Sequence, residues 1–258
     1  MFSSLLLDEP LLEAVAQLGF KEMTEVQAAA IPIALEGRDM IVNAKTGSGK
    51  TLAYVLPMLQ QILDNPQSLT QAIILAPTRD LCRQINKQCT LLAQFTDIST
   101  AIIIGGEDPK HQIKALEKYP DIIIATPGRL LEHVKRDMVV LDAINILVLD
   151  EADRMLAMGF SDDVISIASQ CNEEAQTVLY SASFNQNKFA ELIDAILFDP
   201  EIILVDSSRE NNENVSQQKI LADDNAHKLK LCQYLLEHDT FSKAIIFANK
   251  KETVNQVS

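Results

Sequence analysis

The stretch that decides the fold is Ala44-Lys45-Thr46-Gly47-Ser48-Gly49-Lys50-Thr51, which follows a short apolar run and opens a helix-length segment. Its glycines let the backbone turn amide groups inward, and the N-terminus of the following helix adds further N–H groups that favour an anion. The pattern therefore predicts a phosphate-binding loop, in which Lys50 reaches the β- and γ-phosphates and the Thr51 hydroxyl ligates Mg²⁺. Alanine stands at 44, where the strict pattern has glycine.

Three carboxylates in the segment Asp150-Glu151-Ala152-Asp153 follow another apolar run, Ile146–Leu149. Because parallel strands present their carboxyl ends at one edge of a sheet, we expect Asp150 and Thr51 to meet around one Mg²⁺. Glu151 is placed to orient or deprotonate an attacking water, whereas Asp153 is better suited to hydrogen bonding a neighbouring strand. An isolated acidic run also fits a solvated helix end, so the prediction depends on the pair of motifs.

Short runs rich in Ile, Leu and Val alternate with helix-length amphipathic segments as far as residue 205. Runs that are apolar throughout are typical of strands buried on both faces. The predicted strands are 40–44, 72–76, 100–104, 122–125, 144–149, 177–180 and 202–205. The predicted helices between them are 50–63, 79–95, 109–118, 128–136, 161–171 and 186–198. This alternation predicts an α/β fold, a parallel sheet flanked by helices on both faces, after a helical segment at 5–35.

The composition changes at Asp206, where a polar stretch with almost nothing to bury predicts a linker. A helix at 228–238 and a strand at 243–248 are predicted after it. We therefore expect a nucleotide-binding domain at 1–205, with a distinct N-terminal region at 1–37. A linker at 206–219 and the start of a truncated second domain at 220–258 would follow. A C-terminal hairpin packed on the first domain is the alternative.

The formal net charge of −14 is unlike that of a protein whose whole surface binds nucleic acid, so any such contact has to come from a local patch or from backbone amides. The four cysteines form no CxxC pair, which argues against a zinc site, and Cys82 and Cys89 are spaced to share one buried helix face. The chain has no signal-peptide pattern and no apolar run near the ~20 residues that span a bilayer. We expect a cytoplasmic protein without membrane contact, and nothing implies an obligate oligomer.

In the order and context of these motifs, the chain resembles the DEAD-box RNA helicases over nearly its whole length. The resemblance implies a RecA-like P-loop NTPase fold, ATP and Mg²⁺ as cofactors, and RNA as a partner bound through its backbone with low sequence specificity. The segment from Gly19-Phe20 to Gln27 looks like the adenine-reading Q motif, in which Gln27 would bond the adenine edge and Phe20 would stack on its face. Phe2 matches the family's upstream aromatic position.

The same resemblance implies RNA-backbone contacts at three segments: Pro77-Thr78-Arg79, Gly105-Gly106 and Thr126-Pro127-Gly128-Arg129. Hydroxyls, glycine amides and arginines suit phosphates, although each segment alone also fits an ordinary loop or strand-to-helix turn. Ser181-Ala182-Ser183 occupies the place of the motif that, with Asp153, couples nucleotide state to RNA binding. The aromatic stacking platforms of sequence-tolerant single-strand binders are not evident.

Four positions depart from the family's pattern: Glu25 stands for proline, Lys45 for glutamine, Asp80 for glutamate and Ser183 for threonine. The implied function is ATP hydrolysis coupled to RNA binding and local unwinding, in ribosome assembly or other RNA remodelling. The arginine finger would lie on the largely missing second RecA-like domain, so we expect this chain alone to be weakly active and not to unwind RNA. Two alternatives stay open, a nucleotide-gated RNA clamp and a P-loop ATPase of another class.

Overall fold

The structure, a computed structural model, describes residues 1–184, 186–205, 216, 218–238, 242–250 and 252–254. The chain divides into two compact units, Met1–Arg209 and Glu210–Ser258. The predicted linker at 206–219 lies largely outside the described residues, and the predicted domain boundaries stay a prediction. Among the described helices, none combines the length and the apolar character needed to cross a membrane.

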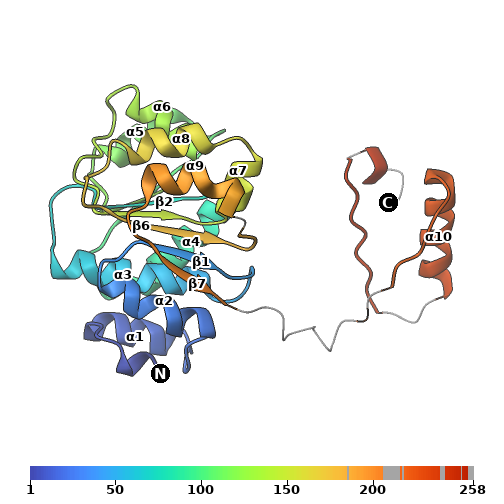
Figure 1. Ribbon diagram of the computed structural model, residues 1–258, viewed down its shortest axis with the longest axis horizontal. Coiled ribbons are helices and arrows are strands. Elements are labelled where there is room, and N and C mark those ends of the chain that lie inside the picture. The colour runs from blue at the N-terminus through green and yellow to red at the C-terminus, as the bar shows by residue number, and fades with distance from the viewer. Residues whose placement is uncertain (185, 206–215, 217, 239–241, 251, 255–258) are drawn as a thin grey trace. The chain divides into compact units, whose positions relative to one another are not determined.

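The first unit is built on a parallel sheet of seven described strands in the order β3-β4-β2-β5-β6-β1-β7 (Figure 1). The strands are β1 (Met40–Asn43), β2 (Ala72–Leu75), β3 (Thr100–Ile103), β4 (Ile122–Ala125), β5 (Ile146–Leu149), β6 (Gln176–Ser181) and β7 (Glu201–Leu204). Every strand predicted in this unit is present. The central β2, β4, β5 and β6 are buried along their whole length, whereas the edge strands β3 and β7 alternate in exposure. The parallel α/β fold is therefore confirmed.

Helices cover both faces of this sheet, with α1–α4 on one face and α6–α9 on the other. Their bounds are η1 (Phe2–Ser4), α1 (Glu9–Gln17), α2 (Glu25–Leu35), α3 (Lys50–Asp64), α4 (Arg79–Leu92), α5 (Pro109–Leu116), α6 (Pro127–Val134), α7 (Ala152–Ala157), α8 (Ser161–Ala168) and α9 (Gln186–Ile196). All the helices predicted in this unit are present, most of them ending two or three residues early. The short α7, which directly follows the acidic motif, was not predicted.

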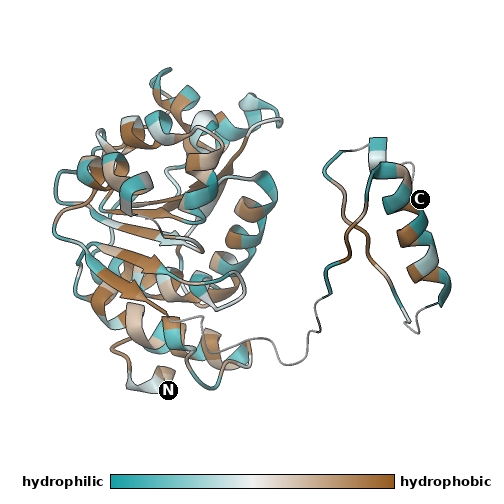
Figure 2. Cartoon of the chain, turned by 45° about the vertical axis from the view of Figure 1, so that its right-hand side comes forward, coloured by the Kyte–Doolittle hydropathy of each residue, from teal (hydrophilic) through white to brown (hydrophobic). Residues whose placement is uncertain are grey.

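Two hydrophobic cores lie on opposite sides of the sheet because successive strand residues point to opposite faces. In β2, Ile74 belongs to the core under α1–α4, and Ile73 belongs to the core on the other face. Figure 2 shows hydrophobic residues concentrated along the strands of this unit. Cys82 and Cys89 are both fully buried in the first core, which confirms their predicted shared face. The sheet is thereby fixed from both sides, and its carboxyl edge is left to carry the site.

In the second unit, the predicted helix is confirmed as α10 (Asn225–His238), but the predicted strand at 243–248 is wrong. This apolar segment forms no ladder with any described residue, and Ile245 and Phe247 are 80% and 90% exposed. A strand needs a neighbour to pair its N–H and C=O groups, and no described segment of this unit supplies one. The interpretation of this unit as the start of a second RecA-like domain stays a prediction.

Candidate functional site

The sequence motifs meet at the carboxyl edge of the sheet because of the strand order. β1, β6 and β5 are neighbours, so the loop after β1, Ser181 at the end of β6 and Asp150 after β5 lie side by side. On the other side of β5, the neighbours β2, β4 and β3 lead to Thr78, Thr126 and Gly105. One edge therefore carries a candidate nucleotide site beside a candidate RNA site, in the place where open parallel sheets bind ligands.

The candidate phosphate loop depends on two glycines with left-handed backbone. Gly47 has φ 84° and Gly49 has φ 92°, and Gly49 is the residue from which α3 starts. A β-carbon on Gly49 would lie 2.5 Å from Nε2 of Gln27. The left-handed backbone angle therefore favours glycine at 49, and a side chain there would also displace the Gln27 amide.

The side chains of this loop leave two buried polar atoms for a ligand. Lys50 is only 6% exposed, and among the described residues neither its Nζ nor the Ser48 Oγ has a hydrogen-bond partner. A buried ammonium without a partner is costly, so such groups are normally paired. An unpaired cation and hydroxyl, next to the free N–H groups that begin α3, fit a nucleotide phosphate.

Gln27 connects the candidate adenine reader to the phosphate loop. Its Nε2 donates to the carbonyl oxygen of Gly49 at 3.0 Å, and its Oε1 accepts from the N–H of Thr24 at 2.9 Å. The Thr24 hydroxyl in turn accepts from the Gln27 N–H, which completes a capping box at the start of α2. The amide keeps one N–H and one lone pair for a ligand edge, so its proposed role in adenine recognition stays open to test.

The two aromatic residues near this region differ in exposure. Phe20, which would stack on adenine, is 38% exposed, and a flat apolar side chain at the surface suits that role. Phe2 is 4% exposed and packs in the hydrophobic core. Phe2 therefore serves packing in this structure.

Asp150 is the most buried carboxylate of the edge, at 3% exposed. Burial raises its pKa, while the charge of Lys50 and the hydrogen bonds from Tyr54 and the Glu151 N–H lower it. The Tyr54 hydroxyl donates to Oδ2 at 3.0 Å, and the Glu151 N–H donates to Oδ1 at 2.9 Å. A buried carboxylate at the same sheet edge as the phosphate loop fits a divalent cation, whose charge would offset the cost of burial.

Glu151 has a left-handed backbone, with φ 52° and ψ 49°, which costs a non-glycine residue about 1–2 kcal/mol. Its carboxylate is 12% exposed and pairs with Arg154 at 2.7 Å, although the Arg154 side chain is 61% exposed. Because the Arg154 end of this pair is exposed to water, the attraction between the two charges is partly screened. The strained turn places the candidate water-positioning group directly beside Asp150, and functional sites often hold strain of this kind.

A hydrogen-bonded connection links α7 to the end of β6. Oδ2 of Asp153 accepts from the Ser183 hydroxyl at 2.7 Å and from the Ser183 N–H at 3.2 Å. The Ser181 hydroxyl donates to the Ser183 carbonyl at 2.8 Å. Serine at 183 thus retains the hydroxyl contact that threonine would make, and the coupling role of these residues stays a prediction.

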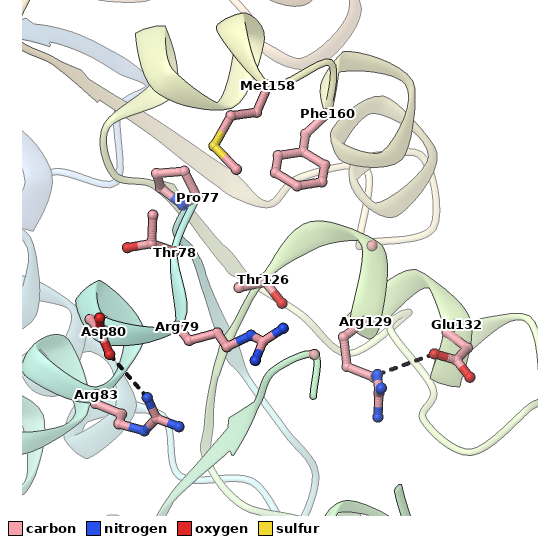
Figure 3. A pocket seen from close by; sticks show the side chains of 12 residues that line it. Pro77, Thr78, Arg79, Asp80, Arg83, Thr126, Arg129, Glu132, Met158 and Phe160 are labelled. Atoms are coloured by element: carbon pink, nitrogen blue, oxygen red, sulfur yellow. Dashed lines mark hydrogen bonds and ion pairs between the residues drawn. The ribbon is translucent and has the colours of Figure 1, made fainter. Parts of the chain in front are cut away.

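The candidate RNA segments surround a groove of about 750 Å³ (Figure 3). The residues that line it are Pro77, Thr78, Arg79, Asp80, Arg83, Gly105, Thr126, Gly128, Arg129, Glu132, Met158 and Phe160. Pro127 is buried in the first turn of α6 and does not line it. Gly106 lies directly under the Arg79 guanidinium, and a β-carbon there would collide with it. Three arginines from two elements, Arg79 and Arg83 of α4 and Arg129 of α6, thus line one groove, although the protein as a whole is acidic.

Acidic neighbours restrain two of the arginines of this groove, Arg129 and Arg83. Arg129 pairs with Glu132 at 3.1 Å and donates to the Glu107 carbonyl at 3.3 Å. Asp80 and Arg83 form an exposed pair at 3.1 Å, so the shorter side chain at position 80 still reaches a cation. The sequence interpretation missed Met158 and Phe160, which lie across the groove from the arginines in Figure 3. In the sequence, the one feature that could have pointed to these two residues is their position just after the acidic motif.

A sequence model of the DEAD/DEAH box helicases matches residues 24–192. The chain belongs to this family. It is 39% identical to the ATP-dependent RNA helicase SrmB of Escherichia coli, with 100% of this chain and 59% of that protein covered. It is 38% identical to DEAD-box ATP-dependent RNA helicase 28 of Arabidopsis thaliana, with 99% and 33% covered. The chain thus spans from about a third to three fifths of the length of these DEAD-box relatives.

Solved structures of DEAD-box proteins share the fold. A DEAD box protein from Methanococcus jannaschii superposes with a TM-score of 0.75 at 33% identity, with 91% of this chain and 62% of that chain covered. A hypothetical ATP-dependent RNA helicase from Sulfolobus tokodaii gives 0.72 at 30% identity, with 97% and 71% covered. The predicted RecA-like fold of the DEAD-box family is therefore confirmed.

Proposed function

We propose that this chain is the nucleotide-binding part of an RNA-stimulated ATPase that opens short RNA duplexes. The observation that carries the proposal is the buried Lys50 ammonium, which lies in a glycine loop near Asp150 and has no hydrogen-bond partner among the described residues. A buried cation with unfilled hydrogen bonds is retained where a ligand supplies acceptors, and the loop N–H groups favour phosphate as that ligand.

The roles of the side chains follow from their positions. Lys50 and the loop N–H groups would bind the phosphates, and Thr51 with Asp150 would hold Mg²⁺. When bound, Mg²⁺ neutralises charge on the phosphates. Glu151 would leave Arg154 and accept a hydrogen bond from the attacking water, which its carboxylate orients.

We propose adenine selectivity from Gln27 and Phe20. ADP and GDP binding should be compared by calorimetry on this chain and on Gln27→Ala. We expect ADP to bind better than GDP, and the substitution to remove the preference. Equal binding of both nucleotides would favour a P-loop ATPase of another class, and no binding to either would overturn the phosphate loop itself.

RNA is the proposed second ligand, bound by its backbone in the groove of Arg79 and Arg129. A nucleotide-gated RNA clamp with little turnover is a second candidate, favoured by the intact contact between Ser183 and Asp153. In the full-length protein, ATP turnover with and without RNA separates the two functions. RNA-stimulated turnover supports the helicase, and tight nucleotide-dependent RNA binding without turnover supports the clamp. Action in ribosome assembly or other RNA remodelling, in the cytoplasm and together with a second RecA-like domain, stays a prediction.

A further inference from the structure

A buried tyrosine joins the phosphate-loop helix to the acidic motif. Tyr54 lies in α3, three residues after Thr51, and is 2% exposed. Its hydroxyl donates to Oδ2 of Asp150 at 3.0 Å, and the other oxygen of that carboxylate accepts from the Glu151 N–H at 2.9 Å. Each carboxylate oxygen therefore has one fixed donor and keeps lone pairs for another ligand. Two donors on two oxygens determine the orientation of the carboxylate plane.

The hydroxyl of Tyr54 is itself held in place by the core. Its ring packs against Tyr180 of β6, with the ring centroids 5.2 Å apart and the planes at 59°. Tyr180 is fully buried, so neither ring can move without disturbing the packing between α3 and the sheet. Residues three apart on a helix lie on one face, so the helix that offers the Thr51 hydroxyl also fixes the Asp150 carboxylate.

We propose that Tyr54 is a positioning residue, whose hydroxyl orients Asp150 toward a divalent cation held with the nucleotide. This inference rests on the proposed function. Groups that hydrogen bond a metal-binding carboxylate fix its direction, and their removal typically weakens metal binding about 10–100-fold. If the bond to Asp150 served only to satisfy the Tyr54 hydroxyl, removal of that hydroxyl would change the stability of the protein and leave cation binding unchanged.

The chain offers a matched control for separating these roles. Tyr54→Phe and Tyr180→Phe each remove one hydroxyl from the same pair of buried rings, and among the described residues the Tyr180 hydroxyl has no hydrogen-bond partner. ADP affinity should be measured for each variant in excess EDTA and again with Mg²⁺. We expect Tyr54→Phe to bind ADP in EDTA as tightly as the unsubstituted chain does. The increase in its ADP affinity on adding Mg²⁺ should be about 10-fold smaller than in the unsubstituted chain. Tyr180→Phe should have the same ADP affinity as the unsubstituted chain, both in EDTA and with Mg²⁺.

Asp150→Asn provides a second, independent readout, because it removes the charge that Tyr54 orients. The double variant Tyr54→Phe/Asp150→Asn should have the same Mg²⁺ gain as Asp150→Asn alone, since the hydroxyl acts through the carboxylate. A Tyr54→Phe variant with the full Mg²⁺ gain, or effects that add in the double variant, would overturn the inference. An unsubstituted chain that binds no ADP would instead overturn the proposed function.

Discussion

Replacing Gly106 by alanine should weaken RNA binding through a displaced arginine and not through the fold. Gly106 has φ +80°, and its β-carbon would overlap the guanidinium of Arg79. The left-handed backbone costs an alanine about 1–2 kcal/mol. The overlap adds little to that cost, because the guanidinium is the free end of a flexible side chain and can swing away from the groove.

Gly37 supplies the matched control, since its φ is +76° and nothing lies within 4 Å of its would-be β-carbon. Gly106→Ala and Gly37→Ala should therefore lower the melting temperature alike, by about 2–8 °C for a unit of this size. Gly106→Ala alone should reduce RNA affinity, because one phosphate contact is lost. On single-stranded RNA that loss should reduce the slope of log affinity against log salt by about 0.7.

The assay is fluorescence anisotropy with a labelled single-stranded RNA over a salt series, with thermal melts of the same samples. Arg79→Ala should reproduce the change in slope, and the double variant Arg79→Ala/Gly106→Ala should show no further loss. Two results would refute the displacement of Arg79: a Gly106→Ala protein whose RNA affinity has the original salt slope, or losses of RNA affinity that add in the double variant.

Three further outcomes are expected. Lys50→Ala should weaken ADP binding about 10–100-fold in calorimetry, because the ammonium it removes has no described hydrogen-bond partner and is available to bind a phosphate. Burial raises the pKa of the Cys82 and Cys89 thiols from 9.0 to about 12. Since the folded-state pKa is the higher one, urea denaturation should show the free energy of unfolding falling from about pH 9 toward pH 12. Gln112→Leu leaves the buried carbonyl of Ile104 without its 2.8 Å donor, so urea unfolding should show a loss of about 1–3 kcal/mol.

Each of these three predictions would be contradicted by a particular result. Undiminished ADP binding by Lys50→Ala would exclude the loop as the phosphate site. Constant stability between pH 9 and pH 11 would show that the thiols are not buried in solution, and their reaction with a thiol reagent in the native protein would agree. An unchanged unfolding midpoint for Gln112→Leu would show that the Ile104 carbonyl finds another donor.

The sheet could be predicted from the sequence because its strands are short runs that are apolar on both faces. The same criterion failed at 243–248, where an equally apolar run has no described strand beside it. Composition indicates which segments are suited to burial, whereas a strand also requires a neighbour. The short α7 was missed because Glu151, the residue that precedes it, has a strained left-handed backbone that no helix-start pattern describes.

The motifs of the site could be predicted, but the residues that support them could not. Tyr54 follows the phosphate loop as an ordinary helix residue, and its bond to Asp150 joins positions 96 apart in the chain. Phe160 approaches Gly128 and enters the candidate RNA groove only because α8 returns beside α6. Contacts of this kind depend on how elements pack, which periodicity and local spacing do not contain.

The short helix α7 has a mechanical consequence. One end begins at Glu151, beside the phosphate loop, and Met158 in the RNA groove directly follows the other. Six residues of helix are a stiff rod about 9 Å long, whereas the strands beside it are clamped on both faces by the two cores. A tilt of this rod about its strained first turn would shift Met158 and would also pull on Ser183, which is bonded to Asp153 of the same helix. One turn and a half of helix would in this way transmit movement between the candidate phosphate site, the candidate RNA groove and the end of β6.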